Sequence, residues 1–476
     1  MPTRRNVLHG LGAGVLGSCI APRFAFADSL GGLSDYNVLE IFLRSGVSHR
    51  ETLWHTPSEC QGRWRDIESI DWPGITNGMV PGHELYSIDG VSDVWVSPCM
   101  EPLIDTPFWS NKRIVNIQHN NNPHVVAQPY MLGGQPPSRS TFTGSAAVAN
   151  HRHSSLPYAG WILSTRSLGS LEPHATRTGV LGDQFRPPLI PFDAGKTDEF
   201  IDRLNQPVTA TQQQLLTLFR DRYSQGLTFP GGSRARSAGF GGYDAVMESF
   251  LARQDLAAIL IHAMTSGSPD ILAGSPLVDE DPLALAIHTA NRLIHQDQAR
   301  YVCVADSGRV LVDDELATRD SHSSDFFREE ENWRRHATTH NLSIWRVTMA
   351  LRHAYDAGTL DPDKTMVVLN TEFGRHPSEN LDPTDDCSTA PGHTDWGSDH
   401  HTQAFPVYLM GGPFMGHDVI GSVDDSIPGG SVVDPTFDAQ HLRIAINAVL
   451  DHDSQDLGLL GGGTYNVDDV RELLNF

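Results

Sequence analysis

Residues 365–401 read TMVVLNTEFGRHPSENLDPTDDCSTAPGHTDWGSDHH, and they indicate the fold more clearly than any other stretch. Their first part, 365–369, is an apolar run that stops at Glu372, and a second apolar run at 405–410 ends in two glycines. A continuous apolar run bounded by turn residues is typical of a strand buried on both faces. Because ligands bind where such strands end in open α/β sheets, chemistry is expected between the two runs. The candidate residues there are Glu372, Arg375, His376, His393, Asp395, Asp399, His400 and His401.

Apolar runs of the same kind predict further strands at 36–43, 113–117 and 300–305. Apolar residues at helical spacing predict helices at 196–223, 243–264, 282–295, 328–357, 438–450 and 467–474. Strands that alternate with helices predict an α/β fold with a mostly parallel central sheet.

The organisation along the chain predicts one large domain, residues 28–476, because no linker, charge block or internal repeat divides it. Residues 119–195 are rich in Gly, Pro, Ser and His and lack periodicity. We expect them to form a long loop region, which in a compact domain is usually functional.

The N-terminus has the features of an export signal. Thr3-Arg4-Arg5-Asn6-Val7-Leu8 is a twin-arginine motif, an apolar stretch follows, and 25–27 read AFA, a cleavage site. Residues 1–27 are therefore predicted to direct the protein to the periplasm or the exterior. Cys19 lies in a lipoprotein box, which is an alternative to the cleavage site at 25–27. If cleavage occurred at this box, Cys19 would carry a lipid anchor. No other apolar stretch is long enough to span a membrane.

The composition restricts the partners. A formal charge of −24 favours a soluble protein and argues against nucleic acid or anionic lipid. The cysteines that would remain after cleavage, Cys60, Cys99, Cys303 and Cys387, are widely spaced, which argues against a thiolate metal cluster. Export permits disulfides, and Cys60–Cys99 is a conceivable pair.

Carboxylates and imidazoles follow three successive strands. Asp320 and His322 come before the long helix, Glu372 ends a strand with Arg375 beyond it, and Asp399 and His400 precede the last strand. Each group has a simpler explanation: a helix cap with a surface histidine, a turn with a salt bridge, or a solvated loop. Together they predict a metal site at the sheet edge, where Arg375 could clamp an oxyanion.

A fourth group, HNNNPH at residues 119–124, follows the predicted strand at 113–117, and Gln128 lies beyond it. Its Asn and His side chains could bind a substrate oxyanion or a metal. The alternative is an Asn-rich turn ahead of a proline.

Several of these motifs resemble one family. VVLNTEFGRHP, GSDHH, FPVYLMGG and the HDVIGS of residues 417–422 are similar to motifs of twin-arginine-exported bacterial proteins, catalogued mainly as a domain of unknown function. That family is placed in the alkaline-phosphatase/sulfatase-like superfamily. Asp320-Ser321-His322 is similar to its D-T-H segment and Leu43-Arg44-Ser45-Gly46 to its first strand end. The resemblance covers most of residues 28–476, is most specific over 365–425, and is poor over 190–300.

The resemblance implies an alkaline-phosphatase-like α/β fold, with helices on both faces of the sheet and a divalent metal site at the strand ends. The implied ligands are Asp320, His322, Glu372, Asp399 and His400. Zinc is the favoured ion, with manganese, calcium and magnesium as alternatives. Arg375 would either support a metal ligand from behind or bind the oxyanion, and Arg375 and His124 would complete the catalytic residues.

The sequence also departs from the family. Where the family has an Asp after its first strand, this chain has Ser48 and His49. No C-x-P-x-R sulfatase motif is present at Cys60 or Cys99. No hydroxyl stands out as a nucleophile, and Ser48, Ser138 and Thr143 are candidates only.

Three functions remain open at this point. The leading hypothesis is an exported metal-dependent hydrolase of phosphate or sulfate esters, acting on a small molecule or a polysaccharide. The second is a non-catalytic binding or assembly protein that retains the fold. The third is a single-metal enzyme of other chemistry.

Overall fold

The computed structural model describes most residues between 36 and 474. The longest segments that it does not describe are 1–35, 55–85, 135–142, 166–175, 219–255, 265–281, 321–329, 377–398 and 451–466, along with several shorter stretches. Among the described residues, no helix is long and apolar enough to cross a membrane. The predicted signal peptide, Cys19 and Cys60 lie outside this part of the chain.

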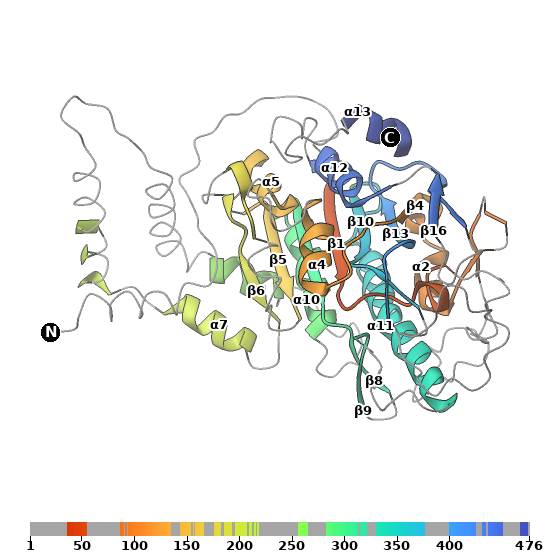
Figure 1. Cartoon of the computed structure of the whole chain (residues 1–476). Helices are drawn as coiled ribbons and strands as arrows, with labels where there is room; N and C mark the ends of the chain where they lie inside the picture. Colours follow the sequence, from red (N-terminus) through yellow and green to blue (C-terminus); the bar gives the residue numbers. More distant parts are fainter. Residues whose placement is uncertain are drawn as a thin grey trace.

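An eight-stranded sheet forms the centre of the protein (Figure 1). In spatial order its strands are β14 (His417–Ile420), β4 (Lys112–Ile117), β13 (Phe405–Gly411), β10 (Thr365–Thr371), β1 (Asn37–Leu43), β7 (Tyr301–Asp306), β5 (Gly160–Ser164) and β6 (Leu189–Pro191). All neighbours pair in parallel, except that β13 is antiparallel to both β10 and β4. The predicted α/β fold with a mostly parallel sheet is confirmed.

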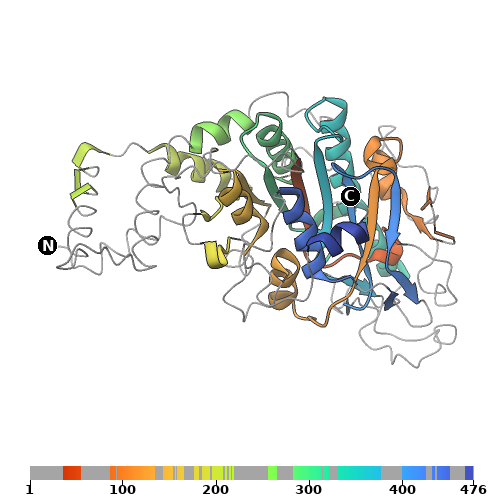
Figure 2. The ribbon, with the colours of Figure 1, turned by 90° about the horizontal axis from the view of Figure 1, so that it is seen from above.

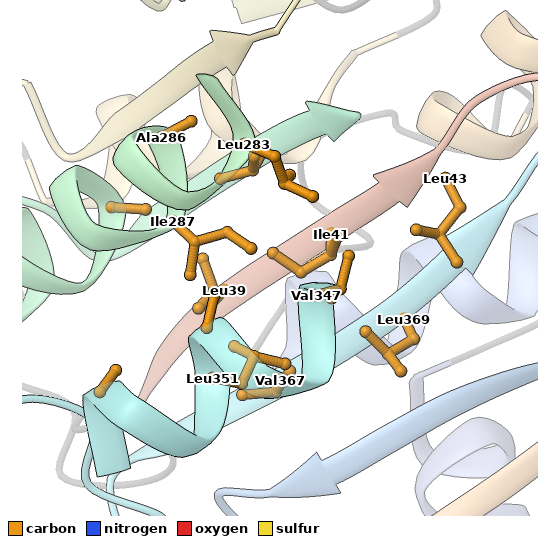
Figure 3. Packing of buried hydrophobic residues seen from close by; sticks show 14 of the residues in the cluster. Leu39, Ile41, Leu43, Leu283, Ala286, Ile287, Val347, Leu351, Val367 and Leu369 are labelled. Carbon is orange, nitrogen blue, oxygen red and sulfur yellow. The ribbon is translucent and has the colours of Figure 1, made fainter. Parts of the chain in front are cut away.

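Helices cover both faces of the sheet, as the alternating side chains of β1 require. Leu39, Ile41 and Leu43 lie in one buried cluster with α10 (Pro282–His295) and α11 (Glu330–Asp356) (Figure 3). Val38 and Phe42 lie in the opposite cluster, with α4 (His124–Gly133), α5 (Ser145–Arg152) and α12 (Ala439–Leu450). Seen from above, α10 and α12 lie on opposite sides of the strands (Figure 2). The burial of both faces explains why the strands are continuous apolar runs.

The remaining elements are smaller. They are η2 (His49–Glu51), β2 (Tyr86–Ser87), β3 (Trp95–Val96), η5 (Pro98–Met100), α2 (Glu101–Ile104), α3 (Pro107–Ser110), η6 (Gly179–Leu181), α7 (Lys196–Asn205), β8 (Arg309–Val312), β9 (Glu315–Thr318), β11 (Gly374–His376), β12 (Asp399–His401), β15 (Ser422–Asp424), β16 (Ser431–Asp434) and α13 (Val467–Leu474).

The expectation that residues 119–195 form a long loop region is wrong, because α4, α5, β5 and β6 lie within this range. Helix α4 contains Pro129 and is buried on most sides, and α5 is built from small residues, so neither has an apolar stripe. Strand β5 has only five residues. Short elements buried all round carry little periodic signal.

The reversed direction of β13 gathers polar segments at one edge of the sheet. Phe405, its first residue, pairs with Ile117, the last residue of β4. Leu43, at the end of β1, pairs with Thr371 of β10 and Asp306 of β7. Residues that precede β13 therefore lie beside residues that follow β4, β10, β1 and β7. Gly411 and Gly412, which end β13, lie at the opposite edge, near Met366.

A buried ion pair ties the sheet to α12. Glu40, in the centre of β1, accepts hydrogen bonds from Arg443 Nη1 at 2.8 Å, from Asn370 at 2.7 Å and from Tyr301 at 2.5 Å. Arg443 Nη2 also contacts the carboxylate, and all four side chains are buried. Burial raises the pKa of Glu40, but the charge of Arg443 and the three donors outweigh burial and lower it.

Candidate metal centre

Glu372 is the central side chain of the carboxyl edge, and it is completely buried. It follows β10 directly, so the strand fixes its position. The backbone N–H of Ser45 donates to Oε1, and the Nδ1 of His124 lies 2.9 Å from Oε2. A carboxylate has only acceptor sites, so Nδ1 of His124 carries the proton and donates it. Each carboxylate oxygen therefore has a donor from a different segment.

His124, at the start of α4, turns its other ring nitrogen toward two further candidates. Its Nε2 lies 3.4 Å from Asp320 Oδ1 and 3.1 Å from His400 Nε2. Burial lowers the pKa of His124, but hydrogen bonds to Asp320 and Glu372 and their negative charges outweigh burial and raise the pKa to about 9. His124 thus joins all three candidates.

His400 is oriented in the same way by an amide. Its Nδ1 lies 2.8 Å from Asn122 Oδ1, an oxygen that only accepts, so Nδ1 carries the proton. In their neutral forms, His124 and His400 therefore have unprotonated Nε2 atoms that lie 3.1 Å apart. Two lone pairs this close repel unless a proton or a metal ion lies between them. Two imidazoles that share a tetrahedral zinc ion have their nitrogens about 3.3 Å apart.

Phe373 forms an apolar wall beneath both imidazoles. Its buried ring stacks on His400, with a centroid distance of 4.0 Å, and lies 5.0 Å from the ring of His124. An apolar wall excludes water from one side of the imidazoles and strengthens charge interactions there.

Arg375 was expected to support a metal ligand or to clamp an oxyanion, and its side chain is completely buried among protein groups. Its Nη2 lies 2.9 Å from Asp320 Oδ1, and its Nε donates to the carbonyl of Ser45. These contacts are suited to holding Asp320 in place.

The turn after β1 supplies backbone groups to the centre. Ser45 and Gly46 both have left-handed backbones, with φ of 76° and 78°. The turn directs the Ser45 N–H at Glu372 and the Ser45 carbonyl at Arg375. A Cβ on Gly46 would lie 2.7 Å from the Phe373 ring. Glycine at this position therefore lets the ring pack under the imidazoles.

We expect Ser45→Gly to raise the free energy of unfolding by about 0.5–1 kcal/mol, because a left-handed backbone is strained in an L-residue. Gly46→Ala should lower it by about 2–4 kcal/mol, since strain is added to a clash with Phe373. Urea denaturation measures both changes. Gly358→Ala is the matched control: Gly358 has φ of 67° with nothing within 4 Å of its Cβ position, so the strain acts alone. Equal losses for Gly46→Ala and Gly358→Ala would contradict the close contact.

The other predicted group, at residues 119–124, divides into two roles. His119 Nε2 lies 2.7 Å from the carbonyl of Glu372, and its Nδ1 accepts the N–H of Asn121 at 3.1 Å. Burial is the main cause that lowers the pKa of His119. Both ring nitrogens are thus used in the protein, so His119 holds the loop, while Asn122 and His124 reach the centre.

The two candidate hydroxyls that the structure describes are buried. Ser48 and Thr143 are almost completely covered, and Thr143 Oγ1 donates to the carbonyl of Thr178 at 3.3 Å. The Ser48 N–H donates to His340 Nδ1 at 3.1 Å. Ser138 lies outside the described residues. A substrate would not reach Ser48 or Thr143 in this arrangement.

Several predicted ligands stay predictions. His322, His393 and Asp395 lie outside the described residues, and Asp399 is placed in β12 by its backbone only. Within the described part of the chain, no three or more His, Cys, Asp or Glu side chains are already arranged to hold a metal ion. His124, His400 and Asp320 are linked by two short contacts that share the Nε2 atom of His124.

The structure does not support the conceivable Cys60–Cys99 disulfide, because Cys99 is a free cysteine. Cys99 is buried, and the hydroxyl of Ser97 donates to its sulfur at 2.9 Å. Burial raises the pKa of the Cys99 thiol to about 12. Its proposed partner, Cys60, is not described.

Sequence reasoning missed two contributors. The first is the contact of Asn122 with His400: the sequence suggested that the Asn side chains of this motif bind an oxyanion or a metal, and the structure shows Asn122 orienting a histidine. The second is the pair formed by Asp306 and Arg319, whose contacts join β7 to the loop that carries Asp320. Asp306 directly follows the predicted strand, which is the position where site residues are expected.

Comparisons with known proteins give a family match and several distant structural likenesses. Residues 355–468 match the family described as Protein of unknown function (DUF1501). This region contains β10, Glu372, Arg375, His400 and β13, and it includes the motifs of 365–425 that carry the sequence resemblance. No curated protein matches the chain.

Solved structures similar to the chain include the lipoteichoic acid synthase LtaP from Listeria monocytogenes, with 10% identity, a TM-score of 0.35, and 94% of this chain and 78% of that chain covered. A protein in the alkaline phosphatase superfamily from Vibrio parahaemolyticus has 8% identity, a TM-score of 0.33, and coverage of 94% and 76%. The alkaline phosphatase of the Antarctic bacterium TAB5, as a variant with magnesium bound, has 10% identity, a TM-score of 0.32, and coverage of 87% of this chain and 97% of that chain.

Proposed function

We propose that the protein is an exported, metal-dependent hydrolase of phosphate or sulfate esters. The observation that carries the metal is the pair of imidazoles, His124 and His400, whose Nε2 atoms face each other at 3.1 Å. Asp320, 3.4 Å from His124 Nε2, would be the third ligand, and His322 and Asp399 are further candidates. Export is supported by the twin-arginine motif of residues 1–27.

The residues around the centre fit a divalent cation. Zinc ligands are usually imidazoles and carboxylates, and a ligating imidazole commonly donates its other N–H to a carboxylate or carbonyl group. Glu372 accepts this hydrogen bond from His124, and Asn122 accepts the corresponding one from His400. Glu372 was expected to be a ligand; with both oxygens engaged, we assign it the role of orienting His124.

The chemistry follows from what each group holds. A divalent ion bound here would polarise an ester oxygen and lower the pKa of a water molecule toward neutrality. Arg375 holds Asp320, Phe373 excludes water from one side, and Glu372 keeps the His124 Nε2 lone pair directed outward. The choice of phosphate or sulfate esters rests on the sequence resemblance over 365–425.

The burial of Ser48 and Thr143 favours a second candidate, a binding or assembly protein that holds the metal without turnover. In the hydrolase, water would be the nucleophile in place of a side-chain hydroxyl. The two candidates therefore differ in whether the protein hydrolyses an ester.

The test is the metal content of protein purified after native export without chelators, followed by assays with nitrophenyl phosphate, phosphodiester and sulfate esters. Bound zinc, manganese, magnesium or calcium with turnover supports the hydrolase. Bound metal without turnover of any ester favours the binding protein. The absence of metal, and of uptake on titration, would overturn both metal-containing functions.

Metal affinity should rise with pH. Because the pKa of His124 is raised to about 9, its imidazole carries a proton at pH 7 that a metal ion must displace. The apparent affinity for zinc should increase about tenfold per pH unit from pH 7 to about pH 9 and then level off. Chelator competition measures the affinity, and weakly buffered titration measures the released proton. An affinity that does not change over this range would show that His124 is not a ligand.

A further inference from the structure

The β8–β9 hairpin carries Asp320 to the candidate metal centre. Strand β7 ends at Asp306 on the carboxyl edge, and the chain returns from the hairpin at Arg319. The N–H of Arg319 donates to the carbonyl of Gly308 at 3.1 Å, which closes the base of the hairpin. Gly308 has φ of 71°, and a Cβ there would lie 2.8 Å from Arg319 Nε. The space for the Arg319 side chain therefore depends on this glycine.

The guanidinium of Arg319 is completely buried and contacts three elements. Its Nη1 lies 2.8 Å from Asp306 Oδ2 and donates to Ser343 Oγ of α11 at 3.1 Å. Its Nε donates to the carbonyl of Arg44, at the end of β1, at 3.1 Å. One side chain thus fastens the hairpin base to the sheet edge and to α11.

A buried ion pair is a costly way to fasten a hairpin. Charges withdrawn from water lose several kcal/mol of solvation, and apolar residues of the same volume often stabilise as well or better. The guanidinium has a rigid planar fork that fixes direction as well as distance. Fixed geometry matters at this position, because the next residue is Asp320, 3.4 Å from His124 Nε2 and 2.9 Å from Arg375 Nη2.

We infer that Arg319, held by Asp306, is a positioning residue that sets the place of the Asp320 carboxylate at the metal centre. This inference rests on the proposed function, since it treats Asp320 as a metal ligand. Arg319 acts through the backbone that it shares with Asp320. Its contribution is therefore to metal affinity and geometry as well as to stability.

The test compares Arg319→Lys with Arg443→Lys in the full protein. Both variants keep the charge of a buried, ion-paired arginine and remove its fork, but Arg443 pairs with Glu40 away from the centre. Both should lower stability in urea. Arg319→Lys alone should weaken zinc binding, by about 10- to 100-fold, and change the visible spectrum of the cobalt-substituted protein.

The outcomes separate this inference from the proposed function. Zinc binding by Arg319→Lys equal to that of the unchanged protein, or equally weakened in both variants, would overturn the inference alone. A protein without metal affinity would overturn the proposed function as well. If Arg319→Lys does not fold, Ser343→Ala removes the hydroxyl that accepts from Arg319 and donates to the carbonyl of His340 within α11, and it should weaken zinc binding about two- to tenfold. Unchanged binding in that variant would also overturn the inference.

Discussion

Replacing both His124 and His400 by alanine should abolish metal binding and, with it, ester hydrolysis. The substitutions remove both nitrogens that face each other at 3.1 Å, leaving Asp320 as the described ligand. Elemental analysis after native export and zinc titration against a chelator measure the loss. His417→Ala, which removes an exposed histidine from β14, is the control and should keep full metal content.

Glu372→Gln separates the orienting role from the ligand role. The Ser45 N–H needs the amide oxygen of the glutamine as its acceptor, so the amide NH2 group faces His124. That donor would meet the proton on His124 Nδ1. The ring would then move its proton to Nε2, the nitrogen that the metal needs. We expect zinc binding to weaken about 10- to 100-fold with the fold retained. Unchanged affinity would remove Glu372 from the centre, and complete loss would favour a direct ligand.

Arg443→Met should produce the largest loss of stability, about 3–5 kcal/mol at neutral pH, because it leaves the carboxylate of Glu40 buried without its cation. Equilibrium urea denaturation measures this loss. Arg352→Met is the control for an exposed ion pair: Arg352 pairs with Asp356 on the surface, so the loss should stay below about 1 kcal/mol. Equal losses in the two variants would contradict the role of the buried pair.

The pH dependence of Arg443→Met should be opposite in sign to that of the unchanged protein. With Arg443 present, the pKa of Glu40 is lowered on folding, so this group contributes stability above its unfolded pKa that is lost as pH falls. Without Arg443, burial dominates and the folded pKa rises above the unfolded pKa, so the Glu40 contribution to stability is recovered as pH falls through the folded pKa toward the unfolded pKa. A variant that loses stability on acidification would contradict the assignment.

The fold could be predicted from the sequence where buried strands and helices leave long apolar runs or apolar stripes. The long runs that became β1, β10 and β13 are buried on both faces, and α11 confirms the helix predicted at 328–357, with a buried stripe of Ile344, Val347, Leu351 and Ala354. The direction of β13 was not readable, because an apolar run has the same pattern in either direction. Strand β5 was too short to be recognised.

The sequence predicted where the candidate site lies better than it predicted the role of each residue in it. The positions of Glu372, Asp320, His124 and His400 at one edge follow from strand ends. Their roles depend on pairings between distant segments, such as Ser45 N–H with Glu372 and Asn122 with His400, which local sequence does not encode. Whether His322 and Asp399 are ligands stays a prediction.

The antiparallel pair of β11 and β12 has an evolutionary consequence. Arg375 is paired with His400 and His376 with Asp399, so the two ends of the segment 377–398 are held side by side. Doubling the length of a segment with fastened ends costs only about 0.6 kcal/mol of closure entropy. Insertions and deletions in this segment would leave Glu372 and His400 in place. Related proteins can therefore vary the length of this segment while they keep the strand pair that places Arg375 and His400.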